Sequence, residues 1–423
     1  MDLKKDAKEI FLKAIESVKP ANVLKNLVSF EENGIKIKGE RFECDKFYLF
    51  GSGKAAIESA KAFEEMSKDK IKEGFIVSNY EERLQKTEVF ESSHPVPSQK
   101  SLKAAEILMK KLENLKENDF FVYLLSGGSS ALIEKPIPPI NMEDLQECTK
   151  ALLLNGASIE EINCVRKHIS LIKGGRLASL TKAKGVVLVI SDVVGNDLST
   201  IGSAPFYPDK TTYKEAYEIL KKYNLLEKIP NSVKSVIEKG VSKKLPETPK
   251  TKNPNIKHFL IAENKTALLA AKEEALKRGF DTKIVTDSLQ GEVEETSKFL
   301  LQKAREEKKS LLFGGETTVF VRGEGKGGRN QELALRILKK LDKNDKFVFL
   351  SGGTDGIDGN SPAAGAVVDY RLKLRAEKLG LDIDDFLKRN DSYTFFKKAG
   401  GIIETSPTGT NVMDICMILK ENR

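Results

Sequence analysis

The feature that most constrains the fold of this chain is a short apolar run that ends in a glycine-rich turn and is followed by a helix-like segment. This pattern recurs along the chain, and alternating strands and helices are the repeating element of α/β folds. Because the runs are almost continuously apolar, they predict strands covered by helices on both faces, as in a parallel sheet. In the first half of the chain the runs are 46–50, 74–78, 120–125 and 185–190.

A chain of 423 residues predicts two domains, because single hydrophobic cores stop growing at about 250–300 residues. Residues 246–256 hold three prolines without apolar periodicity, which is typical of a linker. We therefore expect an N-terminal domain over 1–245, a linker over 246–256 and a C-terminal domain over 257–423. After the linker the strand-like runs resume at 258–262, 282–286, 310–315, 317–323, 346–353 and 401–404.

The composition excludes several classes of protein. An apolar share of 40% and a charged share of 31% are ordinary for a globular protein. No run approaches the roughly 20 apolar residues that span a bilayer, and the first 15 residues of the chain resemble an amphipathic helix, not a signal peptide. The four cysteines lack zinc-ligand spacing, which fits a reducing compartment. We expect a cytoplasmic protein without a membrane partner.

The charge pattern points to small anionic ligands. The formal net charge is +8, but 70 basic and 62 acidic residues are spread along the chain, which argues against nucleic acid as a partner. Three histidines give little support for a histidine metal site or a Ser-His-Asp triad. The chemistry therefore rests on Lys, Arg, Asp and Glu. The sequence does not determine the oligomeric state, and a homodimer is one of the states that it allows.

Two helices are expected at 142–154 and 159–172. An Asn-Gly pair closes the first, and Ser158 with Glu161 three residues later forms a capping box at the start of the second. One face of the second helix carries polar and basic side chains, which are either solvated or directed into a ligand site. They are Asn163 and Ser170, and the two candidate anion ligands Arg166 and Lys173.

The first glycine-rich turn contains Gly51, Ser52, Gly53 and Lys54. Such a turn at a helix start can bind phosphate or carboxylate. It is not a Walker A loop, because that motif needs an earlier glycine and a Ser or Thr after the lysine. It fits the dinucleotide fingerprint, but the next strand ends in Ser-Asn-Tyr without the acidic residue that holds a ribose. A purely structural tight turn is the alternative, and Lys54 favours an anion site.

The second glycine-rich turn also joins a strand to a helix start. Its hydroxyl and backbone groups could surround a phosphate or carboxylate. An N-capped helix start explains the turn about as well. A nucleophilic serine has little support, because the spacing is not G-x-S-x-G and the chain is poor in histidine. The residues are Ser126, Gly127, Gly128, Ser129 and Ser130.

Three further residues have either a structural role or a role in the chemistry. His94 is either a turn histidine or a catalyst. Asp192 and Asp197 follow the run 185–190, at the carboxyl end of a strand, where open α/β sheets bind ligands. Carboxylates beside phosphates hold Mg²⁺ through one or two oxygens plus waters. The two aspartates are therefore candidate metal ligands, with helix capping as the alternative.

The densest set of candidate residues lies in the C-terminal domain. Four of the six residues before Arg329 are glycines, a flexible backbone that brings Lys326 and Arg329 close to a ligand. Arg329 opens a helix-like segment, and a guanidinium near a helix start favours a triphosphate. We expect Gly327, Gly328 and Asn330 to contact phosphate there.

Acidic residues complete this set. Glu316, Asp355 and Asp358 stand in neighbouring glycine-rich motifs. A carboxylate at such a place can bind a metal ion or take the proton of a substrate hydroxyl. Asp355 is our third catalytic candidate, and Glu316 is a candidate metal ligand. Turn chemistry alone explains three such loops within about fifty residues poorly.

Taken together, these motifs resemble those of the glycerate 2-kinase family. The matching motifs run in unbroken order over nearly the whole chain, and the C-terminal part is similar to the leucine-rich "multi-organism fragment" domain of that family. LSGGSSAL lacks a glycine that many relatives have before the serines, and GSGKAAI lacks an aromatic residue that relatives often carry. The motifs are GSGKAA, SSHPVPS, LLSGGSSAL, GASIEEINCVRKHISLIKGGRLA, ISDVVGND, FGGETTV, GKGGRNQELAL, GGTDGIDG and SPTGTNVMD.

The resemblance implies two Rossmann-like α/β domains with largely parallel sheets and an active site in the cleft between them. It implies ATP and Mg²⁺ as reactants, D-glycerate as substrate and 2-phosphoglycerate as product. Lys54 and Arg329 match the lysine and the arginine that are regarded as essential in the family. The Mg²⁺ ion would be held by Asp192, Glu316 or Asp355.

Two other functions stay open. A hydroxypyruvate reductase would act on a related small acid with NADH or NADPH, and the missing ribose-binding acid counts against NADH. A two-domain sensor would bind a phosphorylated acid without turning it over. Cationic and carboxylate groups in separate loops favour chemistry over sensing.

Overall fold

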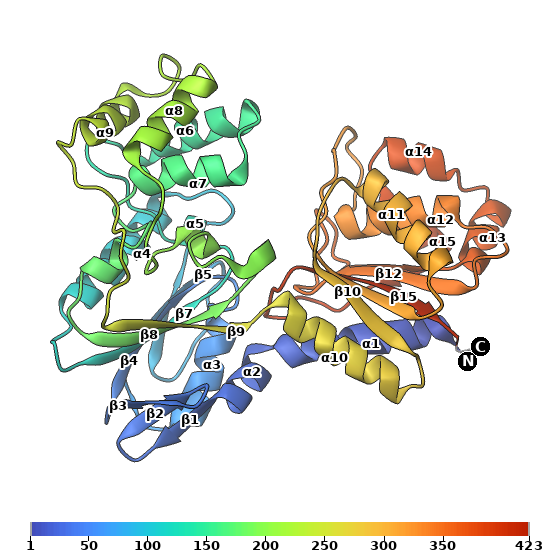
Figure 1. Cartoon of the computed structure of the whole chain (residues 1–423), viewed down its shortest axis with the longest axis horizontal. Coiled ribbons are helices and arrows are strands. Elements are labelled where there is room, and N and C mark those ends of the chain that lie inside the picture. Colours follow the sequence, from blue (N-terminus) through green and yellow to red (C-terminus); the bar gives the residue numbers. More distant parts are fainter. Residues whose placement is uncertain (1, 422–423) are drawn as a thin grey trace. The chain divides into compact units, whose positions relative to one another are not determined.

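The computed structural model of the chain describes residues 2–421 and divides into two compact units, each with a six-stranded sheet and helices packed on it (Figure 1). The predicted α/β class is confirmed. No helix within residues 2–421 is both long and apolar enough to cross a membrane. The N-terminal unit comprises Leu24–Ser191 and Asn196–Ile261, and the C-terminal unit comprises Met1–Val23, Asp192–Gly195 and Ala262–Arg423.

The sheet of the N-terminal unit contains β4 (Phe47–Ser52), β5 (Ile71–Ser78), β6 (Thr87–Glu91), β7 (Phe120–Leu125), β8 (Lys184–Ile190) and β9 (Ile256–Ala262). Its strand order is β6-β5-β4-β7-β8-β9, and the pairs from β6 to β8 are all parallel. The chain adds β5 on one side of β4 and β7 on the other. The strand order therefore reverses between β4 and β7, the place where open α/β sheets bind ligands.

Helices cover this sheet and form a further layer beside it (Figure 1). The layer is α6 to α9, whose buried side chains make a core of their own that includes Leu145, Val165, Leu220 and Ile237. A small antiparallel sheet consists of β1 (Val28–Glu31), β2 (Gly34–Ile37) and β3 (Glu40–Glu43). The helices are α3 (Ala56–Ser67), α4 (Gln99–Glu113), α5 (Ser129–Leu132), α6 (Met142–Leu154), α7 (Ile159–His168), α8 (Tyr213–Lys222) and α9 (Asn231–Val241). Single-turn 3₁₀ helices span Leu177–Ser179, Val194–Asn196 and Ile201–Ser203.

The two helices predicted in this layer are present. α6 has the predicted ends, and the capping box of α7 is formed, with the Glu161 N–H donating to Ser158 Oγ and the Ser158 N–H donating to Glu161 Oε2. α7, however, ends at His168 and not at 172. Ser170 pairs instead with Pro136 in an isolated antiparallel bridge, so an extended segment replaces the last predicted turn of helix.

The sheet of the C-terminal unit contains β10 (Thr282–Leu289), β11 (Ser310–Gly315), β12 (Phe347–Gly353), β13 (Gly365–Val368), β14 (Ile402–Ile403) and β15 (Asp414–Lys420). Its strand order is β10-β11-β15-β12-β13-β14. β10 and β11 are parallel, whereas β15 lies between β11 and β12 and is antiparallel to both. Largely parallel pairing therefore describes the N-terminal sheet, and the C-terminal sheet is mixed, because the last strand of the chain returns through its centre.

Helices lie on both faces of the C-terminal sheet (Figure 1). α1 (Leu3–Val18) and α10 (Asn264–Lys277) cover one face, and Arg278 joins them through ion pairs with Asp6 (3.0 Å) and Glu9 (2.5 Å). The other face carries α11 (Val293–Glu306) and α12 (Arg329–Lys340), with α13 (Tyr370–Lys378), α14 (Ile383–Lys388) and α15 (Ser392–Ala399) packed against α12. α2 (Pro20–Leu27) contains the point at which the chain leaves this unit.

The chain passes between the units at points that differ from the linker predicted over 246–256. These residues belong to the N-terminal unit, where Thr248 Oγ1 donates to Asp209 Oδ2 (3.0 Å) and Asn255 Nδ2 donates to the Lys182 carbonyl (3.1 Å). The following strand, β9, extends the N-terminal sheet beside β8. Prolines and the loss of periodicity mark a change of element, but they carry no information on which sheet the next strand joins.

The strand predicted over 317–323 is not formed. Thr318 makes one isolated bridge with Glu292, and the rest of the segment is a loop with Phe320 exposed. Asn390 Oδ1 accepts hydrogen bonds from the Arg322 N–H (2.7 Å) and the following N–H group (2.9 Å). The Asn390 side chain thus accepts the backbone hydrogen bonds that a neighbouring strand would otherwise accept. The apolar alternation of this segment gives no sign of that contact.

Candidate active site

Two glycine-rich turns meet at the reversal point of the N-terminal sheet. One follows β4 and the other follows β7, and both strands end at the same level of the sheet. The Lys54 N–H donates to the Gly127 carbonyl (2.9 Å), and the Ala55 N–H donates to Ser126 Oγ (3.1 Å). The structure therefore brings together the two turns that the sequence singles out, at the sheet edge where a ligand is expected.

Glycine is required where these turns touch. Gly53 has φ +133°, and a Cβ atom there would lie 2.1 Å from Ser126 Oγ. A Cβ atom at Gly51 would lie 2.8 Å from the Leu124 carbonyl oxygen. The Gly53 N–H donates to the Val77 carbonyl (3.1 Å), so three successive N–H groups of the turn are bonded within the protein. The backbone cradle predicted here is thus occupied by protein acceptors, and Lys54 supplies the positive charge of the turn.

Three of the predicted hydroxyl groups also bond within the protein. Ser52 Oγ lies 2.6 Å from Tyr123 Oη and 2.5 Å from Ser129 Oγ, and both serines are fully buried. Ser126 is buried as well, while Ser130 is only partly buried. Gly128 has φ +86° at the start of α5. Ser52, Ser126 and Ser129 therefore tie the turns together instead of forming a ring of ligand donors.

His94 lies next to these turns. A Cβ atom on Gly128 would be 3.3 Å from His94 Nε2 and 3.3 Å from Lys54 Cγ, so Gly128 contacts both side chains. Partial dehydration of the imidazole and the neighbouring Lys54 ammonium lower the pKa of His94 to about 4. The histidine is therefore neutral at physiological pH, able to accept or donate one hydrogen bond beside the lysine.

Arg166 and Lys173, predicted to contact substrate, point into the protein. Both donate to the Ser130 carbonyl, Arg166 Nη2 at 2.8 Å and Lys173 Nζ at 2.7 Å. Both also face the carboxylate of Glu134, at 3.6 Å and 3.2 Å respectively. Burial lowers the pKa of Lys173 to about 8, and Glu134 opposes that shift. Glu134 was missed by sequence reasoning, because a single glutamate in an otherwise apolar segment gives no pattern.

Asp192 and Asp197, the aspartates predicted as metal ligands, belong to different units. Asp197 accepts the Ser199 N–H (2.9 Å) and the Ser199 hydroxyl (2.8 Å), one on each carboxylate oxygen. These contacts form a local turn with Ser199, whereas the next 3₁₀ helix has Thr200 as its N-cap, so helix capping, the predicted alternative, does not describe Asp197 either. Asp192 lies in the C-terminal unit, close enough to Glu316 to affect its ionisation.

Arg329 is held by two carboxylates in the C-terminal unit. Its Nε and Nη2 atoms donate to the two oxygens of Asp414, at 2.6 and 3.1 Å, and Nη1 lies 2.6 Å from Glu316 Oε1. The Asp414 side chain is 5% exposed and that of Arg329 is 33% exposed. Burial opposes the charge on Arg329, but Asp414 and Glu316 together raise its pKa above the ordinary value. The guanidinium is thus fixed by two carboxylates, while part of the side chain stays open to solvent.

Negative charge accumulates around this arginine. Burial raises the pKa of Glu316 to about 7; Arg329 opposes the shift, and Asp414, Asp192 and Asp355 add to it. Asp414 and Glu316 contact the guanidinium directly, and Asp192 and Asp355 act on Glu316 from nearby. Asp414 was not selected from the sequence as a site residue, although the quoted motif SPTGTNVMD ends with it.

Asn330, expected to contact phosphate, is buried in a cap at the start of α12. The N–H groups of Asn330 and Gln331 donate to the two oxygens of Asp358, at 3.0 and 2.8 Å, and Asn330 Oδ1 accepts the Ser351 hydroxyl (2.6 Å). Burial raises the pKa of Asp358 to about 6, although these N–H donors oppose the shift. Asp358 thus anchors the helix end on which Arg329 stands, and Asn330 belongs to that anchor.

The glycine-rich loop before Arg329 packs against protein. A Cβ atom on Gly327 would lie 2.1 Å from Ser392 Oγ, and one on Gly328 would lie 2.3 Å from Asp358 Oδ1. The Lys326 N–H donates to Asp391 Oδ1 (3.0 Å), and the Gly327 N–H donates to a neighbouring asparagine side chain (2.8 Å). Contacts within the unit therefore account for these glycines without a ligand.

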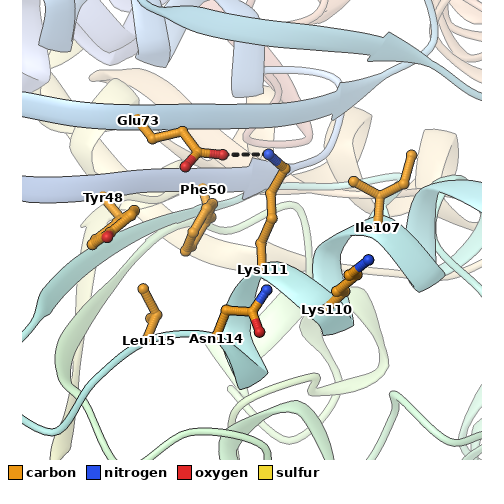
Figure 2. A pocket seen from close by; sticks show the side chains of 8 residues that line it. All are labelled: Tyr48, Phe50, Glu73, Ile107, Lys110, Lys111, Asn114 and Leu115. Carbon is orange, nitrogen blue, oxygen red and sulfur yellow. Dashed lines mark hydrogen bonds and ion pairs between the residues drawn. The ribbon is translucent and has the colours of Figure 1, made fainter.

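A separate cavity of about 330 Å³ lies in the N-terminal unit, and Figure 2 shows the side chains that line it. The rings of Tyr48 and Phe50 stack there with centroids 6.0 Å apart, and the Lys111 ammonium bonds to Glu73 across the opening. The cavity lies toward the amino ends of β4 and β5, away from the glycine-rich turns, and is not part of the site at the reversal point. Its lining residues are Tyr48, Phe50, Glu73, Ile107, Lys110, Lys111, Asn114 and Leu115.

Binding of Mg²⁺ depends on how the acidic side chains are arranged. Among residues 2–421, no group of three or more His, Cys, Asp or Glu side chains is placed to hold a metal ion by itself. Mg²⁺ does not need such a group, because it keeps several waters and binds one or two carboxylates together with substrate phosphates. Glu316, with the carboxylates of Asp192 and Asp355 nearby, therefore fits Mg²⁺ brought in with a nucleotide.

Comparison with known proteins finds relatives along the whole chain. Residues 6–238 match a family described as "Domain of unknown function (DUF4147)", and residues 309–414 match the MOFRL family. The chain is 39% identical to a protein named glycerate 2-kinase from Pyrococcus horikoshii, over 99% of this chain and 98% of the relative. It is 40% identical to a D-glycerate 2-kinase from Thermotoga maritima, over 98% of this chain and 97% of the relative.

A solved structure agrees with these matches. The crystal structure of a glycerate kinase from Thermotoga maritima superposes with a TM-score of 0.87 at 38% identity and covers 99% of each chain. Two domain families in order, relatives of about 40% identity over almost the full length and a shared fold all give the same assignment. The chain belongs to the glycerate 2-kinase family.

Proposed function

We propose that this protein is a glycerate 2-kinase, which transfers the γ-phosphoryl group of ATP to the 2-hydroxyl of D-glycerate and releases ADP and 2-phosphoglycerate. The observation that carries the proposal is Arg329, a guanidinium fixed by Asp414 and Glu316 with part of its surface open to solvent. The names of the full-length relatives support the same reaction.

The chemistry of phosphoryl transfer explains why such a cation is needed. The transferred group spreads negative charge over its three equatorial oxygens, so positioning and fixed positive charge lower the barrier more than covalent steps do. Arg329 is pre-oriented by its bidentate pair, so little reorganisation is needed when this charge develops. We assign Lys54 the same electrostatic role at the glycine-rich turns of the N-terminal unit.

Mg²⁺ would bind through Glu316, with Asp192 or Asp355 as a second ligand, and would neutralise charge on the phosphates of ATP. The position of Glu316 supports this assignment, because Asp192 and Asp355 lie close enough to add to the rise of its pKa that burial causes. Asp355 is also our candidate for the base that takes the proton of the 2-hydroxyl. We leave Asp197 out of the metal site, because Ser199 engages both of its oxygens.

The test is ADP release by the purified protein with D-glycerate, ATP and Mg²⁺, measured against reactions that lack one component. The proposal expects ADP release only when all three are present. Oxidation of NADH or NADPH with hydroxypyruvate, without ADP release, would support the reductase instead. Binding of D-glycerate without either turnover would support the sensor.

A further inference from the structure

Three charged side chains that none of the proposed chemical steps uses lie under the turn that follows β7. Glu134 is 0% exposed, Lys173 is 1% exposed and Arg166 is 12% exposed. Charges are rarely buried to this extent, because their removal from water is unfavourable. A cluster of this kind therefore calls for a structural or functional reason.

All three side chains converge on the end of α5. Arg166 Nη2 and Lys173 Nζ both donate to the Ser130 carbonyl, and Glu134, placed just after α5, faces both cations. Ser170 Oγ donates to Glu134 Oε1 (2.6 Å) and holds the carboxylate in place. The first residue of α5 is also bonded to β4 through Ser52 and Ser129. α5 is thus fixed by β4 and by the charged cluster.

The backbone keeps the members of the cluster in register. The Leu171 N–H donates to the Lys135 carbonyl (2.7 Å), and the Ile137 N–H donates to the Ile169 carbonyl (2.9 Å). These bonds join the segment after Glu134 to the segment that carries Ser170, in the antiparallel sense. The cluster is therefore a product of the fold and not of one flexible side chain.

The cluster is not arranged for maximal stability. Two cations face one carboxylate, and Glu134 Oε2 and Arg166 Nε are buried without a hydrogen-bond partner. Buried polar atoms that lack partners are few in native proteins and lower stability. Stabilisation of the fold alone would favour a neutral or fully bonded arrangement. The cost is explained if the cluster holds the turn at residues 126–130 in a conformation that a ligand needs.

We propose that Glu134 is a positioning residue, which holds Arg166 and Lys173 against the Ser130 carbonyl and so fixes the turn at residues 126–130 for an anionic oxygen of a substrate. The inference rests on the proposed function for the identity of that substrate. The oxygen belongs either to the carboxylate of D-glycerate or to a phosphate of ATP. Arg166 and Lys173 then act on the substrate through Ser130 and do not touch it.

The test compares Glu134→Gln with the wild-type protein by calorimetric titration of D-glycerate and, separately, of ATP. Gln keeps the size of the side chain and an acceptor for Ser170, but it leaves both cations without a carboxylate. We expect Kd to rise at least about tenfold for the ligand whose oxygen lies in the turn, because misplacement by about 1 Å can cost far more. If only the binding of D-glycerate is weaker, the turn holds the carboxylate of D-glycerate. If only the binding of ATP is weaker, the turn holds a phosphate of ATP. Either result, or weaker binding of both ligands, supports the proposal.

A matched control separates positioning from general destabilisation. Lys167 and Asp209 form another buried pair in the same unit, 3.2 Å apart, and Lys167 Nζ bonds to the Ser199 carbonyl. Asp209→Asn should lower the melting temperature and leave both Kd values unchanged. If Glu134→Gln does not fold, Lys173→Met is used in its place. This variant leaves one cation, Arg166, opposite the Glu134 carboxylate, so the remaining pair has no net charge. The proposal expects it to weaken binding of the same ligand.

The outcomes are distinct from those that test the kinase itself. A folded Glu134→Gln protein with wild-type Kd values for both ligands overturns the proposal, as does a folded Lys173→Met protein with wild-type values when the first variant cannot be used. Wild-type protein that binds neither ligand overturns it as well. Wild-type protein that binds both ligands without releasing ADP contradicts the proposed kinase and leaves the binding test of Glu134 valid.

Discussion

Arg329 and Asp414 form a bidentate ion pair, with Nε to Oδ2 at 2.6 Å and Nη2 to Oδ1 at 3.1 Å. Arg329 begins α12 and Asp414 begins β15, the strand that returns through the centre of the C-terminal sheet. The pair therefore joins the two elements at the place where each starts. This geometry orients a guanidinium more strictly than a single contact would.

Asp414→Asn should lower kcat at least about tenfold, because Arg329 keeps its charge but loses the carboxylate that orients it. Arg305 and Asp345 provide a matched control, since they form the same kind of bidentate pair in this unit, at 3.0 and 2.8 Å. Asp345→Asn should affect melting temperature more than kcat. Equal kcat values for the two variants would contradict the orienting role of Asp414.

The raised pKa of Glu316 predicts that the difference in stability between the wild-type protein and Glu316→Gln depends on pH. Burial raises the pKa of Glu316 from 4.5 to about 7, so the folded protein binds this proton more tightly than the unfolded chain does. Its contribution to the free energy of unfolding is fully present below pH 4.5 and is lost as the pH rises through 7. The melting temperature of Glu316→Gln relative to wild type should therefore increase between pH 5 and pH 8, the range set by that shift. A difference that stays constant or decreases would contradict the assigned shift.

Lys54→Ala and Arg329→Ala should each lower kcat/KM by about 100-fold or more, because each removes a fixed cation from the transition state. Both proteins should keep the far-ultraviolet circular dichroism of the wild type. Lys61→Ala is the control for Lys54, since Lys61 lies on the adjoining helix α3 and pairs with Glu58 and Glu82, at 2.7 Å each. Near-normal turnover in either site variant would remove that residue from the mechanism.

Gly53→Ala should abolish most turnover and lower stability. The substitution forces φ +133° on a residue with a Cβ atom, and that atom would lie 2.1 Å from Ser126 Oγ and 2.6 Å from the Ser126 carbonyl oxygen. Backbone strain of this kind costs about 1–3 kcal/mol before the clash is counted. Gly156→Ala is the control, because Gly156 has φ +77° with no atom within 4 Å of the added Cβ. Thermal unfolding and kcat should separate the two variants, and similar losses in both would show that contact between the turns is unimportant.

Local features of this fold could be predicted from the sequence because neighbouring residues determine them. The strand predicted over 120–125 is β7, which begins and ends at the predicted residues, and the capping box of Ser158 and Glu161 forms at the start of α7. The meeting of the two glycine-rich turns, in contrast, depends on the pairing of β4 with β7, which are adjacent in the sheet but not consecutive in the chain.

Contacts between distant segments could not be predicted in this way. The antiparallel entry of β15 between β11 and β12, and the packing of α1 in the C-terminal unit, depend on partners that are distant in the sequence. The predicted role of Lys173 differs from its observed contacts because these contacts, too, are made with a distant segment. Helical spacing placed Lys173 on an open face, but the chain leaves the helix after His168 and directs the lysine to Glu134.

The position of the transferred phosphoryl group tests the central claim most directly. Purified protein is supplied with D-glycerate, ATP and Mg²⁺, and the product is passed to enolase without a phosphoglycerate mutase. The account predicts ADP release with immediate conversion of the product to phosphoenolpyruvate, since enolase accepts 2-phosphoglycerate. ADP release with a product that enolase leaves unchanged would contradict transfer to the 2-hydroxyl, and no ADP release would contradict the kinase.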